Sequence, residues 1–227
     1  MTLLLPFLRK LIILLSTTAS LVLSGCGNGF FPEMDDKELP HYKLAATEQA
    51  WVTPYQVGTE WRFRNAAGYV RRYQVKGFSD RVLPGIPTNS FSVQYYQQEA
   101  GARLERVDSA FYQRPDGYKH AATFTISAAA DFQNQPLPLT ARLEWGLAKL
   151  PLPIAEVNSR QTLPTGVLLL PEAVFAGRTH QNVLVYPNLQ AQPGEKLEAW
   201  MVTSIYYTKE LGVVRFVEAN GTVWDRE

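Results

Sequence analysis

Short runs of alternating polar and apolar residues, separated by turn residues, recur from Thr59 to the end of the chain. The first run, Thr59–Arg64, alternates polar residues with Trp61 and Phe63, and an Asn-Ala-Ala-Gly turn separates it from Tyr69–Val75. A period of two is typical of a strand with one buried face, and two such runs around a short turn predict a β-hairpin. The pattern restricts the domain to an antiparallel all-β fold in which helix is a minor component.

The same alternation predicts further strands in the first half of the domain. They are expected at Ser90–Gln97, Arg103–Gln113 and Tyr118–Ser127, with a turn at Pro115-Asp116-Gly117 before the last of them. Proline presets φ at such a turn and glycine accepts a positive φ.

Repeated prolines interrupt the middle of the chain, and proline is kept out of central strands. We expect strands at Leu139–Trp145 and Gly166–Leu170, a loop over one end of the sheet at Leu147–Val157, and a helical turn at Pro171–Phe175. This region allows a boundary between two subdomains, but the length fits one sheet system equally well.

The last third of the chain has the clearest strand pattern. It predicts strands at Gln181–Tyr186, Lys196–Thr208, Leu211–Glu218 and Thr222–Trp224. Asn220-Gly221 is the strongest short hairpin signal, so the last three strands are expected to form an antiparallel meander.

The N-terminus begins with Arg9 and Lys10, continues as an apolar run, and closes with Leu23-Ser24-Gly25-Cys26. Cations, an apolar middle and small residues at a cut site are the layout of a secretory signal. The final four residues resemble the lipobox of bacterial lipoproteins. This resemblance implies cleavage before Cys26, a diacylglycerol on its thiol and an acyl chain such as palmitate on its new amine, so that residues 1–25 are absent from the mature protein.

This segment has two alternative interpretations besides a lipoprotein signal. An uncleaved membrane helix requires roughly 20 mostly apolar residues, whereas the run from Leu11 to Gly25 covers 15 and contains several hydroxyl side chains. A secreted protein cut near Ala19 would keep Cys26 as a free thiol. Because the chain has no other cysteine, no intramolecular disulfide is available to that residue.

The sequence therefore predicts three parts: a signal peptide at 1–25, a lipid-anchored tether at 26–47, and a single β-rich domain at 48–227. The tether mixes glycine, asparagine, proline and charge without periodicity. By the same resemblance, the protein is expected in the cell envelope. Gly27 is not the aspartate that commonly retains lipoproteins at the inner membrane, which favours the outer membrane in a two-membrane cell.

A second resemblance lies near the C-terminus. Tyr206–Phe216 places an aromatic pair before a turn and a Gly-Val-Val strand, and it is similar to the closing hairpin of uncharacterised β-rich envelope lipoproteins. The similarity supports the class of protein and implies no activity.

Charge excludes one class of partner. Residues 1–25 contain two cations and no carboxylate, so the mature chain has a formal charge of −1. General nucleic-acid binding needs a strongly basic surface. The expected partners are instead the membrane, through the Cys26 anchor, and an envelope protein, lipid or glycan.

The sequence contains no recognisable catalytic or metal-binding motif. His41, His120 and His180 are widely separated, and no metal-ligand spacing, nucleophile elbow or glycine-rich phosphate loop is present. We therefore expect a protein that is not an enzyme and that has no cofactor and no metal site.

Arginine is concentrated in the first half of the domain, where eight residues lie between Arg62 and Arg114. Guanidinium groups bind phosphate and carboxylate in bidentate fashion. The alternation places Arg62 and Arg64 on one face of the sheet, and if Arg71 pairs across the first hairpin, two to four guanidinium groups form a basic patch that recognises an anionic headgroup or glycan. The alternative is the solvated face of an antiparallel sheet, balanced by nearby carboxylates.

The predicted fold is an antiparallel meander of about ten strands, arranged as a curved sheet, open barrel or sandwich. Two functions follow. The first is a non-catalytic envelope lipoprotein that binds or scaffolds a partner on its sheet surface. The alternative is a lipid or lipoprotein carrier, which resembles in layout the outer-membrane lipoprotein receptors and requires an apolar cavity. Its expected lining is Phe63, Tyr73, Trp145, Trp200 and Ile205.

Overall fold

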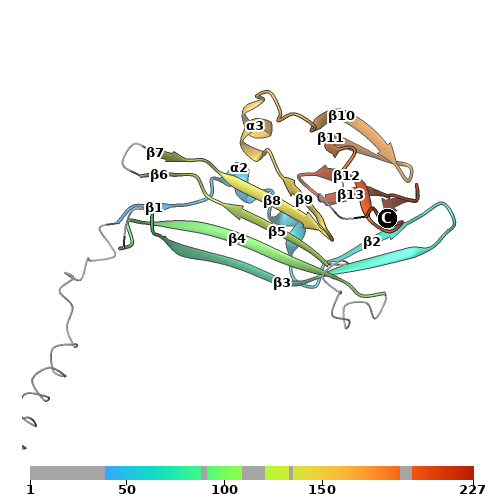
Figure 1. The fold of residues 1–227 in the computed structure, drawn as a ribbon, viewed down its shortest axis with the longest axis horizontal. Helices are drawn as coiled ribbons and strands as arrows, with labels where there is room; N and C mark the ends of the chain where they lie inside the picture. Colours follow the sequence, from blue (N-terminus) through green and yellow to red (C-terminus); the bar gives the residue numbers. More distant parts are fainter. Residues whose placement is uncertain (1–38, 88–90, 109–120, 133–134, 190–195) are drawn as a thin grey trace, which may run out of the picture. The chain divides into compact units, whose positions relative to one another are not determined.

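The structure, a computed structural model, describes residues 39–87, 91–108, 121–132, 135–189 and 196–227, and Pro40–Glu227 form one compact unit. Strands dominate, which confirms the all-β prediction (Figure 1). They are β1 (His41–Tyr42), β2 (Glu60–Arg64), β3 (Val70–Gly85), β4 (Tyr95–Arg106), β5 (Ala121–Ser127), β6 (Ala130–Phe132), β7 (Gln135–Leu137), β8 (Thr140–Trp145), β9 (Ala148–Pro151), β10 (Leu168–Phe175), β11 (Arg178–Tyr186), β12 (Val202–Thr208), β13 (Gly212–Glu218) and β14 (Val223–Arg226).

The helices among the described residues are short. They are α2 (Ala46–Gln49), the 3-10 turn η2 (Thr53–Tyr55) and α3 (Ile154–Ser159). Within the part of the chain that the structure describes, no helix has the length and apolar character needed to cross a bilayer.

One antiparallel sheet forms the domain. Its strands follow the order β10-β11-β12-β13-β14-β2-β3-β4-β5-β8-β9, and β1 adds in parallel beside the start of β4. The β6–β7 hairpin pairs separately. Most neighbours in this order are also neighbours in sequence, so the sheet is largely a meander, as predicted.

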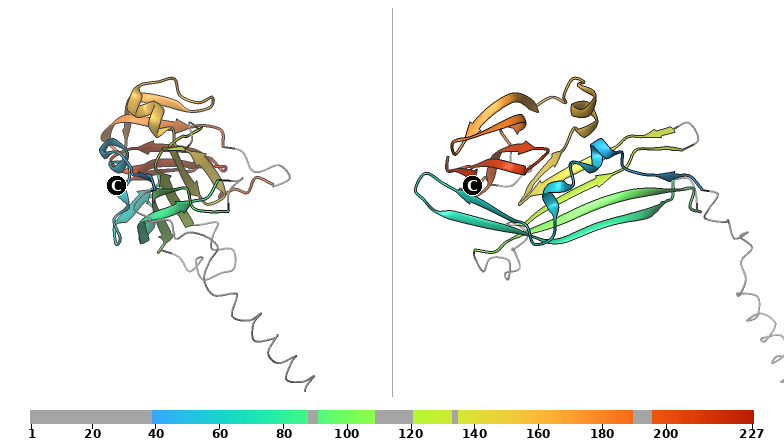
Figure 2. Two further views of the ribbon diagram at one scale, coloured as in Figure 1. Left: turned by 90° about the vertical axis from the view of Figure 1, so that its left-hand side faces the viewer. Right: turned by 180° about the vertical axis from the view of Figure 1, so that it is seen from behind.

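The sheet curls into a half-barrel, so strands far apart in the order face each other (Figure 2). Trp145 of β8 packs against Phe63 of β2 and Phe216 of β13, with ring centroids 5.8 and 5.5 Å apart. Near the two ends of the order, the Tyr186 hydroxyl of β11 donates a 2.8 Å hydrogen bond to the carbonyl of Pro151 in β9. Aromatic packing therefore fills the concave side of the sheet.

A segment before β2 crosses this concave side, and we call residues 44–56 the strap. Trp51 stacks on Tyr207 of β12 at 5.9 Å, and Tyr55 stacks on Phe124 of β5 at 4.3 Å. The hydroxyls of Tyr55 and Tyr207 lie 3.1 Å apart in a hydrogen bond. Because Trp51 and Tyr55 are fully buried, the strap is part of the core.

The two hairpins with the strongest turn signals are confirmed. In the first, β2 and β3 pair from Glu60↔Gln74 to Arg64↔Val70 around Gly68, whose φ is +85°. In the second, Gly221 has a φ of +82° between β13 and β14. Both glycines occupy left-handed backbone that other residues rarely adopt.

The strands predicted at Ser90–Gln97 and Arg103–Gln113 are joined in the structure by one continuous strand, β4. The sequence between them, with Ala100, Gly101 and Ala102, lacks bulky alternating residues. The structure gives the reason. The stacked rings of Tyr55 and Phe124 occupy this part of the concave side, so small side chains on β4 are enough to fill the remaining space.

Three predictions in the second half of the chain are corrected. Pro171–Phe175 is part of β10 and not a helical turn, because β10 is an edge strand and can accommodate a proline. Leu147–Val157 forms β9 and the start of α3 rather than a loop. The strand predicted at Lys196–Thr208 begins only at Val202.

The compact unit begins earlier than the predicted tether ends. His41 and Tyr42 pair with Tyr96 and Gln97 of β4, and Leu44 is buried. Residues 40–47 therefore belong to the ordered domain. The signal segment, Cys26, Arg114, the turn at 115–117 and His120 lie outside the described residues.

Candidate functional site

The predicted cavity residues pack against one another. Phe63 and Tyr73 meet edge to face at 5.9 Å, and Tyr73 lies 4.8 Å from Trp145. These three and Ile205 are buried in the main hydrophobic core. Trp200 does not join them, because it precedes β12 and is half-buried. The curled sheet therefore holds a packed core at the position where a carrier would need its cavity.

The predicted arginine patch is divided by the register of the first hairpin. Arg62 lies opposite Arg72, whereas Arg71 lies opposite Phe63. Residues directly opposite each other share a face of the sheet, so Arg71 is on the inner face and not beside Arg62 and Arg64. A one-residue difference in register changes the face of every side chain, and the sequence did not fix that register.

Arg71 stabilises a buried carboxylate. Its guanidinium lies 4.0 Å from the Trp224 ring centroid and donates a 2.6 Å hydrogen bond to Glu218. Glu218 also accepts a 3.0 Å hydrogen bond from Trp224 Nε1. This cluster closes one end of the core, which is a structural role for Arg71.

The remaining arginines of the set are also charge-balanced. Among the described residues, each forms an ion pair with a carboxylate: Arg62 and Arg64 with Glu227, Arg72 with Glu60, Arg81 with Glu99, Arg103 with Glu105, and Arg106 with Asp108. Arg106 lies opposite Tyr73 on the inner face, and the outer face has the composition of a solvated sheet face, which was the alternative to a basic patch.

The described histidines do not meet. His41 stacks on Tyr96 at 4.8 Å, while His180 is buried against Phe175. Burial, followed by the charge of Arg178, lowers the pKa of His180. In the described ranges, no three histidine, cysteine or carboxylate side chains are grouped in a way that would hold a metal ion.

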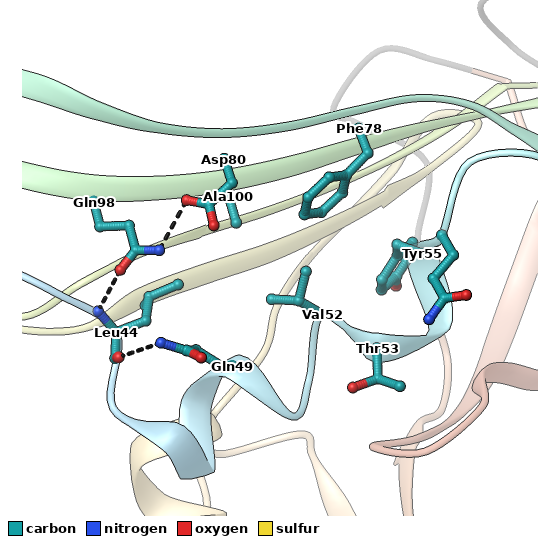
Figure 3. A pocket seen from close by; sticks show the side chains of 10 residues that line it. Leu44, Gln49, Val52, Thr53, Tyr55, Phe78, Asp80, Gln98 and Ala100 are labelled. Atoms are coloured by element: carbon teal, nitrogen blue, oxygen red, sulfur yellow. Dashed lines mark hydrogen bonds between the residues drawn. The ribbon is translucent and has the colours of Figure 1, made fainter.

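A groove of about 300 Å³ opens between the strap and strands β3 and β4 (Figure 3). The apolar part of its wall is formed by Leu44, Val52, Tyr55, Phe78 and Ala100, and the polar part by Gln49, Thr53, Gln56, Asp80 and Gln98. This size lies at the lower end of the range for ligand pockets, and an apolar wall with a few convergent polar groups is their usual composition.

Hydrogen bonds hold one end of the groove in shape. The Leu44 amide donates to Gln98 Oε1 at 2.9 Å, and Gln98 Nε2 donates to Asp80 Oδ1 at 2.8 Å. Gln49 Nε2 closes the first turn of the strap by donating to the Leu44 carbonyl at 2.9 Å. The strap is thereby fixed to β3 and β4.

Phe78 is the exposed apolar residue of the groove, with 39% of its surface accessible. Figure 3 shows its ring pointing from β3 toward Val52 and Tyr55 of the strap. Burial raises the pKa of Tyr55 well above its ordinary value, and Tyr207 contributes in the same direction, so this wall of the groove stays uncharged.

The groove lies beside an open strand edge. β2 pairs with β3 only as far as Gln74, so from Lys76 to Gly85 β3 pairs with β4 alone among the described strands. We call Val70–Val75 the core half of β3 and Lys76–Gly85 its ribbon half. The free edge of the ribbon half presents unpaired backbone donors and acceptors next to an apolar groove.

Two other hollows have walls that are mainly charged or hydroxylated. One of about 610 Å³ contains Arg64 and Arg215, but these pair with Glu227 and Asp225. One of about 540 Å³ lies over threonine, serine and charged side chains of β4, β5, β8 and β9. Neither combines an apolar wall with a free strand edge.

Comparison of the chain with protein-family models, with curated proteins and with solved structures gives no match. The geometry of the groove and the sequence of the N-terminal segment are therefore the features from which a function is inferred.

Proposed function

We propose that this chain is a lipid-anchored cell-envelope protein that binds a partner without catalysis, through the groove between its strap and the ribbon half of β3. The lipobox-like Leu23-Ser24-Gly25-Cys26 supports the anchor. The observation that carries the binding role is the position of Phe78. The Phe78 ring lies partly exposed in the groove, on a sheet whose other inward-facing rings are mostly buried.

The chemistry of the groove favours an extended segment of a partner protein. Such a segment adds to an open strand edge through main-chain hydrogen bonds, and adjacent pockets receive alternate side chains. The ribbon half of β3 provides the edge, and Phe78, Val52 and Leu44 provide an apolar pocket. Gln49, Gln56 and Gln98 supply amide groups that suit a peptide more than a hydrocarbon chain.

The carrier function has less support. The rings expected to line its cavity pack into the core, and the groove is small for a complete lipid. An acyl chain in the groove is therefore the competing outcome of the experiment, and lipid carriage is not proposed.

The first test is the mass of the mature protein, released gently from bacterial membranes and measured under native and denaturing conditions. The denatured mass should start at Cys26 and include the diacylglyceryl and acyl groups, and Cys26→Ala should lose them. The native mass should contain no additional lipid. An unmodified Cys26 would contradict the lipid anchor. A bound lipid that is present in the native mass and lost on denaturation would favour the carrier function.

A further inference from the structure

Near the end of the β3–β4 ribbon, described residues on both sides of 88–90 are apolar and exposed. Ile86, just after β3, is 56% exposed, Phe91 is fully exposed, and Val82 near the end of β3 is 48% exposed. We call these three residues the ribbon tip. The sequence contains no charged residue between Arg81 and Glu99, although 19% of the whole chain is charged.

An uncharged apolar tip is unusual for a ribbon surrounded by water. Exposed hairpins and strand edges are normally protected by charged side chains. The turn between β12 and β13 of this chain follows that rule, with Lys209-Glu210. The ribbon tip departs from it, so its surroundings are expected to be less polar than bulk water.

The route of the chain places the predicted anchor within reach of the same end of the domain. β1 runs beside the start of β4, where the Tyr96 amide donates a 2.8 Å hydrogen bond to the Pro40 carbonyl. The chain therefore enters the domain close to the ribbon tip (Figure 1). Thirteen residues separate Cys26 from Pro40, and even fully extended they span at most about 50 Å.

Aromatic rings lie just behind the tip. Tyr42 contacts Tyr95 edge to face at 5.9 Å, and His41 stacks on Tyr96. Tyrosine is enriched where protein meets the headgroup region, because its ring is apolar and its hydroxyl is polar. The Tyr42 hydroxyl donates a hydrogen bond to the Asp131 carbonyl of β6.

We propose that the ribbon tip inserts into the headgroup and upper acyl region of the membrane that holds the anchor, with Ile86 and Phe91 as the inserting side chains. This inference depends on the lipid anchor of the proposed function. One lipidated residue tethers the domain, and a second apolar contact orients it. The β3 strand, about 50 Å long at 3.3 Å per residue, would then project the first hairpin away from the lipid.

The test uses the full chain, processed and purified from bacterial membranes. Cys26 is the sole cysteine, so an acylated protein has no free thiol, and Ile86→Cys or Phe91→Cys can receive an environment-sensitive fluorophore. Tyr69→Cys is the matched control, because Tyr69 is 70% exposed and adjoins the opposite end of β3. Labelled protein is reconstituted into phosphatidylethanolamine–phosphatidylglycerol vesicles that contain nitroxide lipids.

We expect at least a twofold greater quenching at positions 86 and 91 than at 69, with a blue shift at those two positions only. With the label at Val82→Cys, the added pair Ile86→Asp and Phe91→Asp should reduce quenching to the level of the control. If the protein floats with the vesicles but quenching is equal at all sites, the ribbon tip does not insert, and the proposal of a lipid anchor still stands. If the protein does not float and its Cys26 reacts with the fluorophore, both the lipid anchor and the insertion of the ribbon tip are wrong.

Discussion

The two halves of β3 belong to one strand but occupy different environments. In the core half, Tyr73 and Val75 are buried between β2 and β4. In the ribbon half no residue is buried, and Phe78 and Val82 have large exposed surfaces. One continuous strand therefore supports the fold at one end and leaves an exposed apolar surface at the other.

The largest difference between the halves should appear on truncation of an apolar side chain. Tyr73→Ala removes a ring that contacts Phe63 and Trp145, and should lower the free energy of unfolding by about 3–5 kcal/mol. Val82→Ala in the ribbon half should change it by less than about 0.5 kcal/mol. Urea unfolding of the two variants measures both values, and similar losses would show that the division of β3 is wrong.

The ion pairs on the two halves should also contribute unequally to the free energy of unfolding, with the larger contribution in the core half. Arg71→Ala leaves Glu218 buried without its cation and should cost about 3 kcal/mol. Arg81→Ala breaks an exposed pair with Glu99 and should cost less than about 1 kcal/mol. Double-mutant cycles with Glu218→Gln and Glu99→Gln isolate each coupling energy. A coupling at Arg81 equal to that at Arg71 would contradict the comparison.

The strap links the halves, and Gln98 is the residue that fixes it. Gln98→Ala removes the acceptor of the Leu44 amide and the donor to Asp80, and should cost about 1–2 kcal/mol. Hydrogen exchange should become faster in residues 44–49 while β12 and β13 stay protected. Gln94→Ala, just before the same strand and outside the groove, is the control. Unchanged exchange in the strap would mean that these bonds do not hold it.

The smallest expected effect is a pH dependence at the core half. Burial alone would raise the pKa of Asp108, but the hydrogen bonds from Arg106 and the Arg72 amide outweigh it, and the pKa is lowered. Because the folded pKa lies below the unfolded one, this stabilisation is present above the unfolded pKa near 3.8 and is lost as pH falls through the folded value.

Unfolding measured from pH 6 downward should therefore show less acid destabilisation in Asp108→Asn than in the unmodified chain. Asp131→Asn, which removes a carboxylate on β6, serves as the control. An identical acid profile for Asp108→Asn and the unmodified chain would contradict this role of Asp108.

The parts of the fold that were predictable have local causes. Alternation around Trp61 and Phe63 and the Asn220-Gly221 turn determine two hairpins within a few residues, so the sequence reveals them. The continuity of β4 was missed because its centre, Ala100–Ala102, is adapted to rings from the strap and β5 that lie far away in sequence.

The groove could not be predicted, because its walls meet only in the folded chain. Leu44 and Val52 precede the first hairpin and lay in or next to the expected tether, whereas Phe78 follows the end of the predicted hairpin. An isolated phenylalanine in the polar stretch Lys76–Arg81 was the one available signal. The arginine prediction failed at Arg71 for a different reason, since it depended on the register of β2 and β3.

The ribbon half of β3 and its groove form the proposed binding surface. The most direct measurement is photocrosslinking in living bacteria, with a photoreactive amino acid at Phe78 of the full chain and the matched position at Tyr69. Crosslinks to a discrete envelope protein from position 78, absent from position 69 and reduced by filling the groove with Thr53→Trp, are the predicted result. Equal crosslinking from both positions, or adducts to lipid alone at position 78, would contradict it.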